Sequence, residues 1–296
     1  MSSGLRSARP RGRPPAQWTP SGVVTMLSDF GTADAYAGIM SGVVLTAAPD
    51  ARVVHLTHAV PAQEISLGAM LLRSAVEYFP AGTVHLAVVD PGVGGARDPI
   101  LVVTDRAVLV GPDNGLLYPA AVDLGLREVR RIEARELFRE PVSHTFHGRD
   151  IFAPIAGRLA AGRSPGEMGP TLPVMRSLDF SRCNDDGGQI TGEVVYVDHF
   201  GNLITNIPTG DLADCGVAID LGDRCVAGIA SSYSDVATGE MVAVRGSWGM
   251  LEIAQRDGSA ASALQLSRGS RVVVRRLAGG RPGAGNTGGD NTGTGL

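Results

Sequence analysis

Lysine is absent from the sequence, and all 26 basic residues are arginines. Because this preference for arginine over lysine acts on every basic position, a single arginine carries little functional information by itself. Positive charge is also in the minority, since 30 acidic residues give the 296-residue chain a net charge of -4. A protein that binds nucleic acid generally needs a basic surface. We therefore expect no nucleic-acid partner.

Cysteines and long apolar segments are scarce as well. The cysteines, Cys183, Cys215 and Cys225, are odd in number and far apart, which excludes a disulfide scaffold and a zinc ribbon. This usage favours a reduced, cytoplasmic protein. No apolar run approaches the roughly 20 residues of a membrane span, and residues 1–21 lack the apolar centre of a signal peptide. We expect no membrane partner and a disordered tail over residues 1–21.

The apolar content of 44% is enough for a sizeable core, and the length favours two domains. Strand-like and helix-like segments alternate over residues 22–180, which predicts an α/β domain with a mainly parallel sheet. Residues 189–277 contain several short apolar runs separated by turn residues, which predict a small antiparallel β-barrel domain. Residues 278–296 are low in complexity and are expected to form a second disordered tail.

The clearest candidate site begins with an almost continuous apolar run, which predicts a buried parallel strand ending in Asp90. Pro91 and several glycines follow, so that the backbone can approach a ligand closely. Arg97 lies seven residues after Asp90, close enough in a tight loop to pair with the carboxylate and keep it ionised. Open α/β sheets bind ligands at this end of their strands. The alternative is a structural Asp–Arg bridge in a strand-end turn.

Two other predicted strands also end in polar residues. The first leads into Asp29, whose carboxylate suits the vicinal hydroxyls of a ribose or serves only in a turn. Asp34 is the expected N-cap of a helix over residues 34–47. The strand that begins at residue 108 leads into Asp113 and Asn114, which either face the same cleft as Asp90 or only form a turn.

Histidines occur in two predicted contexts. His55 and His58 fall in a predicted strand over residues 52–58, where their spacing places them on opposite faces, so we expect structural roles. His144 and His147 lie in a loop before a predicted helix over residues 150–161. For His147 the alternatives are loop packing and a general base or water-orienting group, whereas His144 is expected to pack. A metal site built from His144, His147 and Asp90 is the alternative, but no third-ligand spacing or acid-helix motif supports it, and we expect none.

Two loops of the second predicted domain carry polar and aromatic side chains. One combines Asp198, Phe200 and Asn202, which suit a planar ring and a polar group but equally suit a hairpin turn. The other spans residues 247–252 and contains Trp248, which is either a binding platform or a barrel residue. Residue types alone leave these alternatives open.

Taken together, several segments resemble the S-adenosyl-L-methionine hydroxide adenosyltransferases, relatives of the bacterial fluorinase and chlorinase. The resemblance runs from residue 23 to residue 277, and the order and spacing of its segments are jointly specific. The segments are 28–34 (SDFGTAD), 88–94 (VVDPGVG), 111–117 (GPDNGLL), 145–150 (TFHGRD), 198–202 (DHFGN) with Asn206, and 249–254 (GMLEIA).

The resemblance implies an N-terminal α/β domain, a C-terminal β-barrel and a homotrimer. In that family the nucleoside cleft lies between the N-terminal domain of one subunit and the C-terminal domain of its neighbour. The reaction is attack at the ribose C5′ of S-adenosyl-L-methionine (SAM), which gives adenosine and L-methionine when water or hydroxide is the nucleophile. SAM is the substrate, and the resemblance implies no cofactor.

The same resemblance implies roles for individual residues. An Asp–Arg–His triad of the family maps onto Asp90, Arg97 and His147, which would hold the attacking water. Asp29 would accept hydrogen bonds from the ribose hydroxyls. The remaining implied substrate-binding residues are Asp113, Asn114, Phe146 and Ser247, then Asp198 and Asn202 for the methionine part with Phe200 beside them. Residues 250–254, which include Glu252 and Ala254, would contact the adenine from the neighbouring subunit.

Departures within the wider family indicate the nucleophile. The halogenases have tyrosines where this chain has Asp90 and His147, and the fluorinase has a serine donor where it has Gly148. Because Asp90 would repel a halide, water is the expected nucleophile. Gln63 stands where halogenases have a tryptophan packing on the ribose. Two alternatives remain, a halide-using enzyme of the same fold and a non-catalytic sensor of SAM or adenosine.

Overall fold

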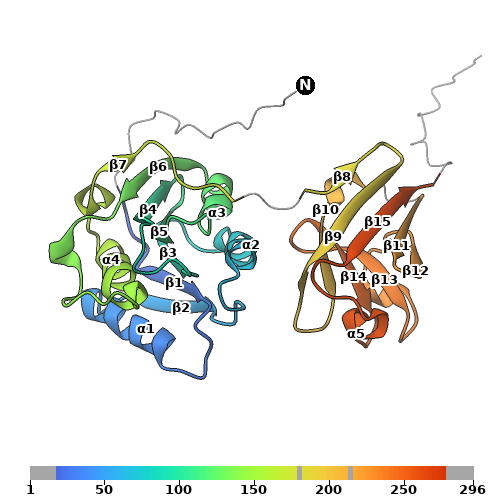
Figure 1. The fold of residues 1–296 in the computed structure, drawn as a ribbon, viewed down its shortest axis with the longest axis horizontal. Helices are drawn as coiled ribbons and strands as arrows, with labels where there is room; N and C mark the ends of the chain where they lie inside the picture. The colour runs from blue at the N-terminus through green and yellow to red at the C-terminus, as the bar shows by residue number, and fades with distance from the viewer. Residues whose placement is uncertain (1–17, 179–181, 213–215, 278–296) are drawn as a thin grey trace, which may run out of the picture. The chain divides into compact units, whose positions relative to one another are not determined.

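The computed structural model describes residues 18–178, 182–212 and 216–277. The described residues fall into two compact units, with the division between residues 180 and 181 (Figure 1). The predicted C-terminal tail, most of the predicted N-terminal tail and Cys215 lie outside the described residues. Trp18 was assigned to the N-terminal tail, yet its indole N–H donates to the Leu159 carbonyl oxygen at 3.0 Å. This hydrogen bond connects Trp18 to the first unit.

The first unit contains a seven-stranded sheet in the order β2-β1-β3-β5-β4-β6-β7. Its strands are β1 (Val23–Ser28), β2 (Arg52–Thr57), β3 (Thr83–Val88), β4 (Pro99–Thr104), β5 (Ala107–Pro112), β6 (Leu126–Arg131) and β7 (Thr171–Leu172). The pairs among β2, β1, β3 and β5 are parallel, whereas β4, β6 and β7 pair antiparallel. The predicted α/β class is confirmed, with a mixed sheet. Strands β4 and β5 are antiparallel because the turn between them is too short for a crossover connection.

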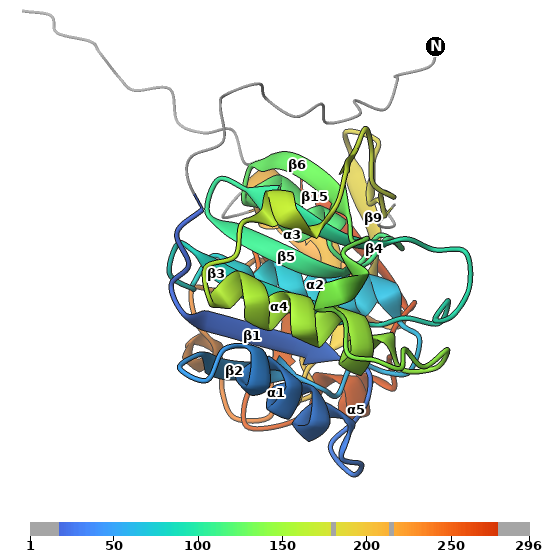
Figure 2. The ribbon, with the colours of Figure 1, turned by 90° about the vertical axis from the view of Figure 1, so that its left-hand side faces the viewer.

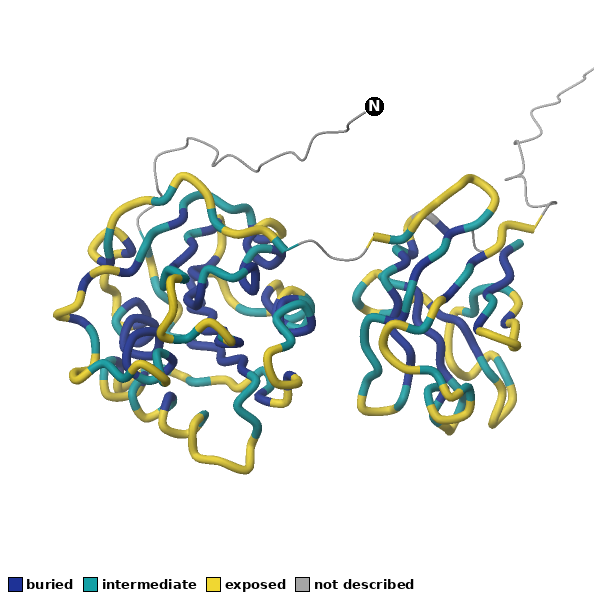
Figure 3. The backbone as a smooth tube through the Cα atoms, in the orientation of Figure 1, coloured by how far each residue is buried: buried dark blue, intermediate teal, exposed yellow. Residues whose placement is uncertain are grey.

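Helices cover both faces of this sheet (Figure 1). Helices α1 (Tyr36–Ala47) and α4 (Ala153–Ala160) pack with β1 and β3 in one apolar cluster. Helices α2 (Ile65–Val76) and α3 (Tyr118–Asp123) pack in a second cluster on the opposite face. Figure 3 shows the buried strands between these layers, and Figure 2 shows α1 and α4 side by side. Short 3-10 turns lie at Arg135–Leu137 and Pro165–Met168.

Two helix starts differ from the sequence predictions. Helix α1 begins at Tyr36 with Ala35 at its N-cap, so the prediction that Asp34 caps it is wrong. Before α4 the chain forms a π-helical turn, Gly148–Phe152, where an α-helix from residue 150 was predicted. Pro154 explains the change, because it has no N–H to donate to the Asp150 carbonyl oxygen. That oxygen accepts from the Arg139 N–H at 2.9 Å instead.

Strand β3 carries a buried histidine that makes folding dependent on pH. Burial lowers the pKa of His85 to about 4, and its Nδ1 lies 2.7 Å from Thr25 Oγ1. In the unfolded chain the His85 ring takes up a proton near pH 6.5, whereas in the folded protein it does so only near pH 4. The contribution of the neutral ring to folding stability is therefore fully present above pH 6.5 and is lost as the pH falls toward 4. The loss from this histidine is about 3 kcal/mol over that range.

The prediction is tested by urea unfolding of the wild type and His85→Asn at pH 7 and pH 4.5. The variant should lose less stability on acidification, whatever its stability at pH 7. An equal loss of unfolding free energy in both proteins would exclude His85 as the source.

The second unit is an antiparallel sheet of eight strands in the order β12-β11-β15-β9-β10-β14-β13, with β8 paired to β9. Ala230, just beyond β12, pairs with Val244 of β13 and brings the two ends together, so the predicted antiparallel barrel is confirmed as a nearly closed one. The strands are β8 (Asn184–Asp185), β9 (Gln189–Val197), β10 (Leu203–Pro208), β11 (Val217–Leu221), β12 (Arg224–Ala227), β13 (Met241–Arg245), β14 (Met250–Gln255) and β15 (Arg271–Arg276). Its helical segments are α5 (Ala260–Leu264) and 3-10 turns at Thr209–Asp211 and Tyr233–Asp235. Within the described residues of both units, no helix has the length and apolar character to cross a bilayer.

Candidate active site

The three acidic residues singled out at strand ends of the first unit follow neighbouring parallel strands. Asp29 comes directly after β1, Asp90 two residues after β3, and Asp113 directly after β5. Since β1, β3 and β5 are adjacent and parallel, their carboxyl ends lie at one edge of the sheet. That edge is where open α/β sheets bind their ligands.

Asp90, Arg97 and His147 form one hydrogen-bonded group. Arg97 Nε donates to both carboxylate oxygens of Asp90 at 3.0 Å, and its Nη2 donates to Oδ2 at 2.5 Å. The same Nη2 lies 2.7 Å from His147 Nδ1. The side chains of Arg97 and Asp90 are only 7% and 5% exposed. Arg97 also lies over the ring of buried Phe152, 5.4 Å from its centroid, which fixes the guanidinium.

The contact between Arg97 and His147 fixes the protonation of the imidazole. A guanidinium has only N–H donors, so Nδ1 of His147 accepts and a neutral ring carries its hydrogen on Nε2. Burial lowers the pKa of His147, and the neighbouring Arg97 lowers it further. Near pH 7 the imidazole is therefore neutral and can donate, but not accept, a hydrogen bond through Nε2.

Close packing joins the loop after Asp90 to the loop that carries His147. Gly94 has φ of 75°, and a Cβ there would lie 2.4 Å from the His144 carbonyl oxygen. Only glycine combines that conformation with so close an approach. The loops therefore hold Asp90 and His147 on either side of Arg97, although 57 positions separate the two residues in the sequence.

Buried Asp150 organises the histidine loop from its far end, a role that the sequence analysis missed. Its carboxylate accepts from the Ser143 N–H at 2.9 Å and from both Nε and Nη2 of Arg149. Burial alone would raise the pKa of Asp150, but the hydrogen bonds from Arg149 and Ser143 more than offset this and leave the pKa lowered. Asp150 thus remains an ionised anchor of the loop.

At the end of β1, Asp29 and a pair of histidines stabilise the neighbouring turn. Asp29 Oδ2 accepts from the N–H of Gln63 at 2.9 Å, and Gln63 has φ of 68°. The prediction that His55 and His58 point to opposite faces is wrong, because β2 ends at Thr57. His55 Nδ1 lies 2.7 Å from His58 Nε2, and the other ring nitrogen of His58, Nδ1, lies 2.7 Å from Ser28 Oγ. Burial lowers the pKa of His58, so this chain of hydrogen bonds links Ser28, beside Asp29, to a neutral ring.

Asp113 and Asn114 use their polar atoms to hold backbone. Asn114 Nδ2 donates to the Val89 carbonyl oxygen at 2.8 Å, which connects the end of β5 to the residue before Asp90. Asp113 Oδ1 accepts from the Arg176 N–H at 2.8 Å, and burial raises the pKa of Asp113. Both side chains therefore hold the backbone in place at the carboxyl edge of the sheet.

Three aromatic rings cluster beside His147. Phe146 packs edge-to-face against Phe30 and Tyr36, at centroid distances of 5.7 and 5.3 Å. Phe146 was singled out from the sequence, whereas Phe30 and Tyr36 were not. They come from the loop after β1 and the start of α1, so the cluster connects the Asp29 and His147 loops.

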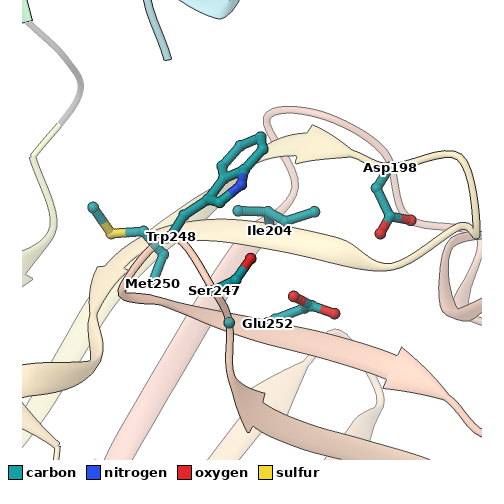
Figure 4. Close-up of a pocket in the computed structure, with 7 residues that line it drawn as sticks. Asp198, Ile204, Ser247, Trp248, Met250 and Glu252 are labelled. Carbon is teal, nitrogen blue, oxygen red and sulfur yellow. The ribbon is translucent and has the colours of Figure 1, made fainter. Parts of the chain in front are cut away.

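The second unit contains a pocket of its own, lined by Asp198, Ile204, Gly246, Ser247, Trp248, Met250 and Glu252 (Figure 4). Asp198, Ser247 and Glu252 were predicted from the sequence and lie together here. The ring of Tyr196 stacks on Trp248 at 5.6 Å with an interplanar angle of 8°, which stiffens the pocket wall. Tyr196 was not foreseen.

The other predicted residues of the second unit are placed differently. Asn202 does not line the pocket, but its N–H and Nδ2 donate to Asp198 at 2.8 and 3.1 Å. Phe200 is 73% exposed, and Ala254 is 1% exposed within β14. No group of three or more side chains suited to a metal ion occurs in the parts of the chain that the structure describes.

Comparisons with known proteins agree on one family. Residues 24–169 match the SAM hydroxide adenosyltransferase N-terminal domain, and residues 192–273 match the C-terminal domain. The chain is 39% identical over 260 residues to an (R)-S-adenosyl-L-methionine hydrolase of Salinispora tropica, covering 86% of this chain and 98% of the relative. It is 40% identical over 256 residues to a protein of the same name from Thermus thermophilus, covering 84% and 98%.

A fluorinase of Nocardia brasiliensis is more distant, at 25% identity over 289 residues that cover 86% of this chain and 96% of the fluorinase. The crystal structure of an uncharacterized conserved protein from Thermotoga maritima is similar, with a TM-score of 0.80 and 35% identity. The similarity covers 86% of this chain and 100% of that one.

Proposed function

The chain belongs to the SAM hydroxide adenosyltransferase family, and on that premise we propose that it hydrolyses SAM to adenosine and L-methionine. Relatives named (R)-S-adenosyl-L-methionine hydrolase match it over nearly their whole length. The observation that carries the proposal is the hydrogen-bonded group formed by Asp90, Arg97 and His147 after the parallel strands, in which the side chains of Asp90 and Arg97 are buried.

In the proposed reaction, a water oxygen forms a bond to ribose C5′ while the bond from C5′ to sulfur breaks. The electron pair of that bond remains on sulfur, which leaves as the neutral thioether of methionine. A sulfonium is already a good leaving group, so the enzyme mainly aligns water, carbon and sulfur and excludes bulk water.

The triad geometry supports a division of roles. His147 would donate its Nε2 hydrogen to the water oxygen and orient a lone pair toward C5′. Arg97 has no acceptor, and His147 Nδ1 is already occupied, so Asp90 is the remaining acceptor for the proton of the water. Asp90 Oδ1 accepts only one of the three Arg97 hydrogen bonds and keeps a free lone pair.

Two features favour water over a halide in this proposal. The Asp90 carboxylate would repel an anion beside it, and the repulsion grows as water is excluded. Gly148 occupies the position of the fluorinase serine, and a Cβ there would lie 3.0 Å from Met40 Sδ. A serine donor would therefore require Met40 to move.

The proposal extends to substrate contacts and assembly. We assign the ribose hydroxyls to Asp29 and the methionine part to the loop of Asp198 and Asn202 with Ser247. We further propose a cytoplasmic homotrimer, in which the N-terminal unit of one copy and the C-terminal unit of another complete each site. Light scattering should then give three times the 30.6 kDa chain mass, and a monomer that is fully active would contradict this assembly.

The proposed activity is tested by incubating the purified chain with SAM and separating the products by chromatography. Adenosine and L-methionine should appear in equal amounts and in proportion to enzyme, with no change when chloride or fluoride is added. A 5′-halo-nucleoside as the main product would identify a halide-using enzyme, and SAM binding without turnover would identify a sensor.

The role of His147 predicts a specific pH dependence. Because the ring must be neutral to accept from Arg97, kcat should be constant above pH 6.5 and fall in more acid solution, as His147 is protonated through its lowered pKa. His147→Gln can still accept from Arg97 and donate to water, so it should keep kcat within about 10-fold and lose that acid limb. The measurement is kcat between pH 5 and pH 8, with His144→Gln as the control. A loss of about 1,000-fold in His147→Gln would instead identify His147 as the base.

A further inference from the structure

A chain of hydrogen bonds runs from the surface of the first unit to the residue before Asp29. Its members are His55, His58 and Ser28, with Ser41 of helix α1 at the outer end. His55 Nε2 lies 3.4 Å from Ser41 Oγ, and its Nδ1 lies 2.7 Å from His58 Nε2. His58 Nδ1 lies 2.7 Å from Ser28 Oγ. His55 is exposed, whereas His58 and Ser28 are buried, so the chain leads inward from solvent.

The donors and acceptors of this chain follow from its outer end. Ser41 Oγ donates its hydrogen to the Ala37 carbonyl oxygen at 3.0 Å, so it accepts from His55 Nε2. A neutral His55 then accepts at Nδ1, and His58 donates to it from Nε2. His58 Nδ1 is left as an acceptor, and its donor is the Ser28 hydroxyl. In the neutral chain every contact therefore pairs one donor with one acceptor.

A single proton added to the two imidazoles reverses the inner end of the chain. If His55 takes up the proton, its Nδ1 becomes a donor, so His58 must accept at Nε2 and carry its hydrogen on Nδ1. If His58 takes up the proton, both of its nitrogens are donors. In either case His58 Nδ1 donates to Ser28 Oγ, and the Ser28 hydroxyl loses its acceptor. The proton thus acts on Ser28 whichever ring holds it.

Ser28 and His58 both hold the loop that carries Asp29. Ser28 Oγ accepts from the Phe30 N–H at 3.3 Å, and the His58 carbonyl oxygen accepts from the Gly31 N–H at 2.7 Å. In the reversed chain Ser28 Oγ receives two donors, the His58 ring and the Phe30 N–H, and its own hydrogen must turn to a different acceptor. The backbone on both sides of Asp29 is therefore held by contacts that depend on the protonation of the imidazoles.

Few charged groups surround the two imidazoles. Helix α1 contains no charged residue, and strand β1 is followed by Asp29. Strand β2 contributes Arg52, three residues before His55, and the turn after β2 leads to Glu64 at the N-cap of α2. Burial lowers the pKa of His58, and the neighbouring His55 lowers it further. His58 is therefore neutral near pH 7, and the chain reverses only in more acid solution.

We propose that this chain positions Asp29 for the ribose hydroxyls of the substrate, and that one proton on its imidazoles weakens the binding of the ribose. The inference rests on the proposed function, in which Asp29 accepts from those hydroxyls. It adds His55, His58 and Ser28 as positioning residues, which act through the Asp29 loop and do not touch the substrate. The site then holds a nucleoside most tightly at neutral pH and releases it more readily in acid solution.

The test measures adenosine binding by calorimetry at pH 7.5 and pH 5.5, beside 2′,3′-dideoxyadenosine, which lacks both ribose hydroxyls. The wild type should bind adenosine about 3- to 10-fold more weakly at pH 5.5, the effect of one perturbed hydrogen bond, and should bind the dideoxy analogue equally at both pH values. His58→Asn keeps an acceptor for the Ser28 hydroxyl but takes up no proton. It should bind adenosine equally at both pH values, about as tightly as the wild type does at pH 7.5.

Ser28→Ala is the second variant, because it leaves both imidazoles in place and removes only their contact with the Asp29 loop. Its adenosine affinity should also be the same at both pH values. His144→Gln removes an exposed histidine outside the chain and serves as the matched control, which should keep the wild-type pH dependence.

Turnover separates this chain from the triad. Between pH 7.5 and pH 5.5 the KM for SAM should rise in the wild type and stay constant in Ser28→Ala, whereas both should keep the acid limb of kcat that comes from His147. Equal adenosine affinity of the wild type at both pH values would overturn the inference. So would a pH dependence that persists in Ser28→Ala and His58→Asn or that the dideoxy analogue shares. A wild type that binds adenosine as expected without hydrolysing SAM would refute the proposed function alone.

Discussion

Replacement of Asp90 by asparagine is expected to lower kcat for SAM hydrolysis by about 100- to 10,000-fold, the usual contribution of a general base. Asparagine has nearly the same shape, but it cannot take a proton from water at neutral pH. Its amide nitrogen would also face the donors of Arg97, where the wild type has an acceptor. SAM binding should change far less than kcat, because the proposed substrate contacts lie on other residues.

The matched control for this variant is Asp220→Asn. Asp220 also accepts from both Nε and Nη2 of an arginine, Arg275, but this pair lies in the second unit between β11 and β15. Rates are measured with SAM above KM, and binding is measured by calorimetry. Turnover within about threefold of wild type in Asp90→Asn would remove the carboxylate from the mechanism.

Replacement of Arg97 by lysine is the second substitution with a large expected effect. One Arg97 Nη2 contacts both Asp90 Oδ2 and His147 Nδ1, while Nε holds the other side of the carboxylate. A lysine ammonium keeps the positive charge but cannot reproduce this planar fork. We expect kcat to fall about 100-fold as Asp90 and His147 lose their alignment.

Lysine is preferable to alanine in this experiment. Arg97→Ala would leave the buried Asp90 carboxylate unpaired, which typically costs about 3 to 5 kcal/mol of folding stability and would obscure the kinetics. Arg275→Lys is the control, since Arg275 makes a similar fork with Asp220 far from the triad in sequence. Equal kcat in Arg97→Lys and wild type would show that charge alone suffices and that the fork has no catalytic role.

The sequence was most informative where function depends on strand ends. The apolar run into Asp90, the glycine-rich loop and the spacing to Arg97 predicted an ion pair that the structure contains. The same reasoning placed Asp29 and Asp113 after predicted strands but left a turn role open for each, and the structure brings these strand ends to one edge of the sheet. Both fold classes followed from the change in apolar periodicity between the two halves of the chain.

The missed features depend on contacts between residues that are distant in sequence or on backbone geometry. The hydrogen bond from Tyr233 to Glu252 has no signature in periodicity, and neither does the stacking of Tyr196 on Trp248. The His55–His58 contact was mispredicted because an ideal strand was assumed through a residue where β2 has already ended. Asp34 has a favourable residue type for a helix cap, yet the helix begins two residues later.

The account depends most on the origin of the oxygen in the product. The direct measurement is hydrolysis of SAM in 18O-labelled water, followed by mass spectrometry of the adenosine. We predict one labelled oxygen in each adenosine formed, at the 5′ position, and none in the L-methionine. Unlabelled adenosine, or methylthioadenosine as the nucleoside product, would contradict attack of water at C5′.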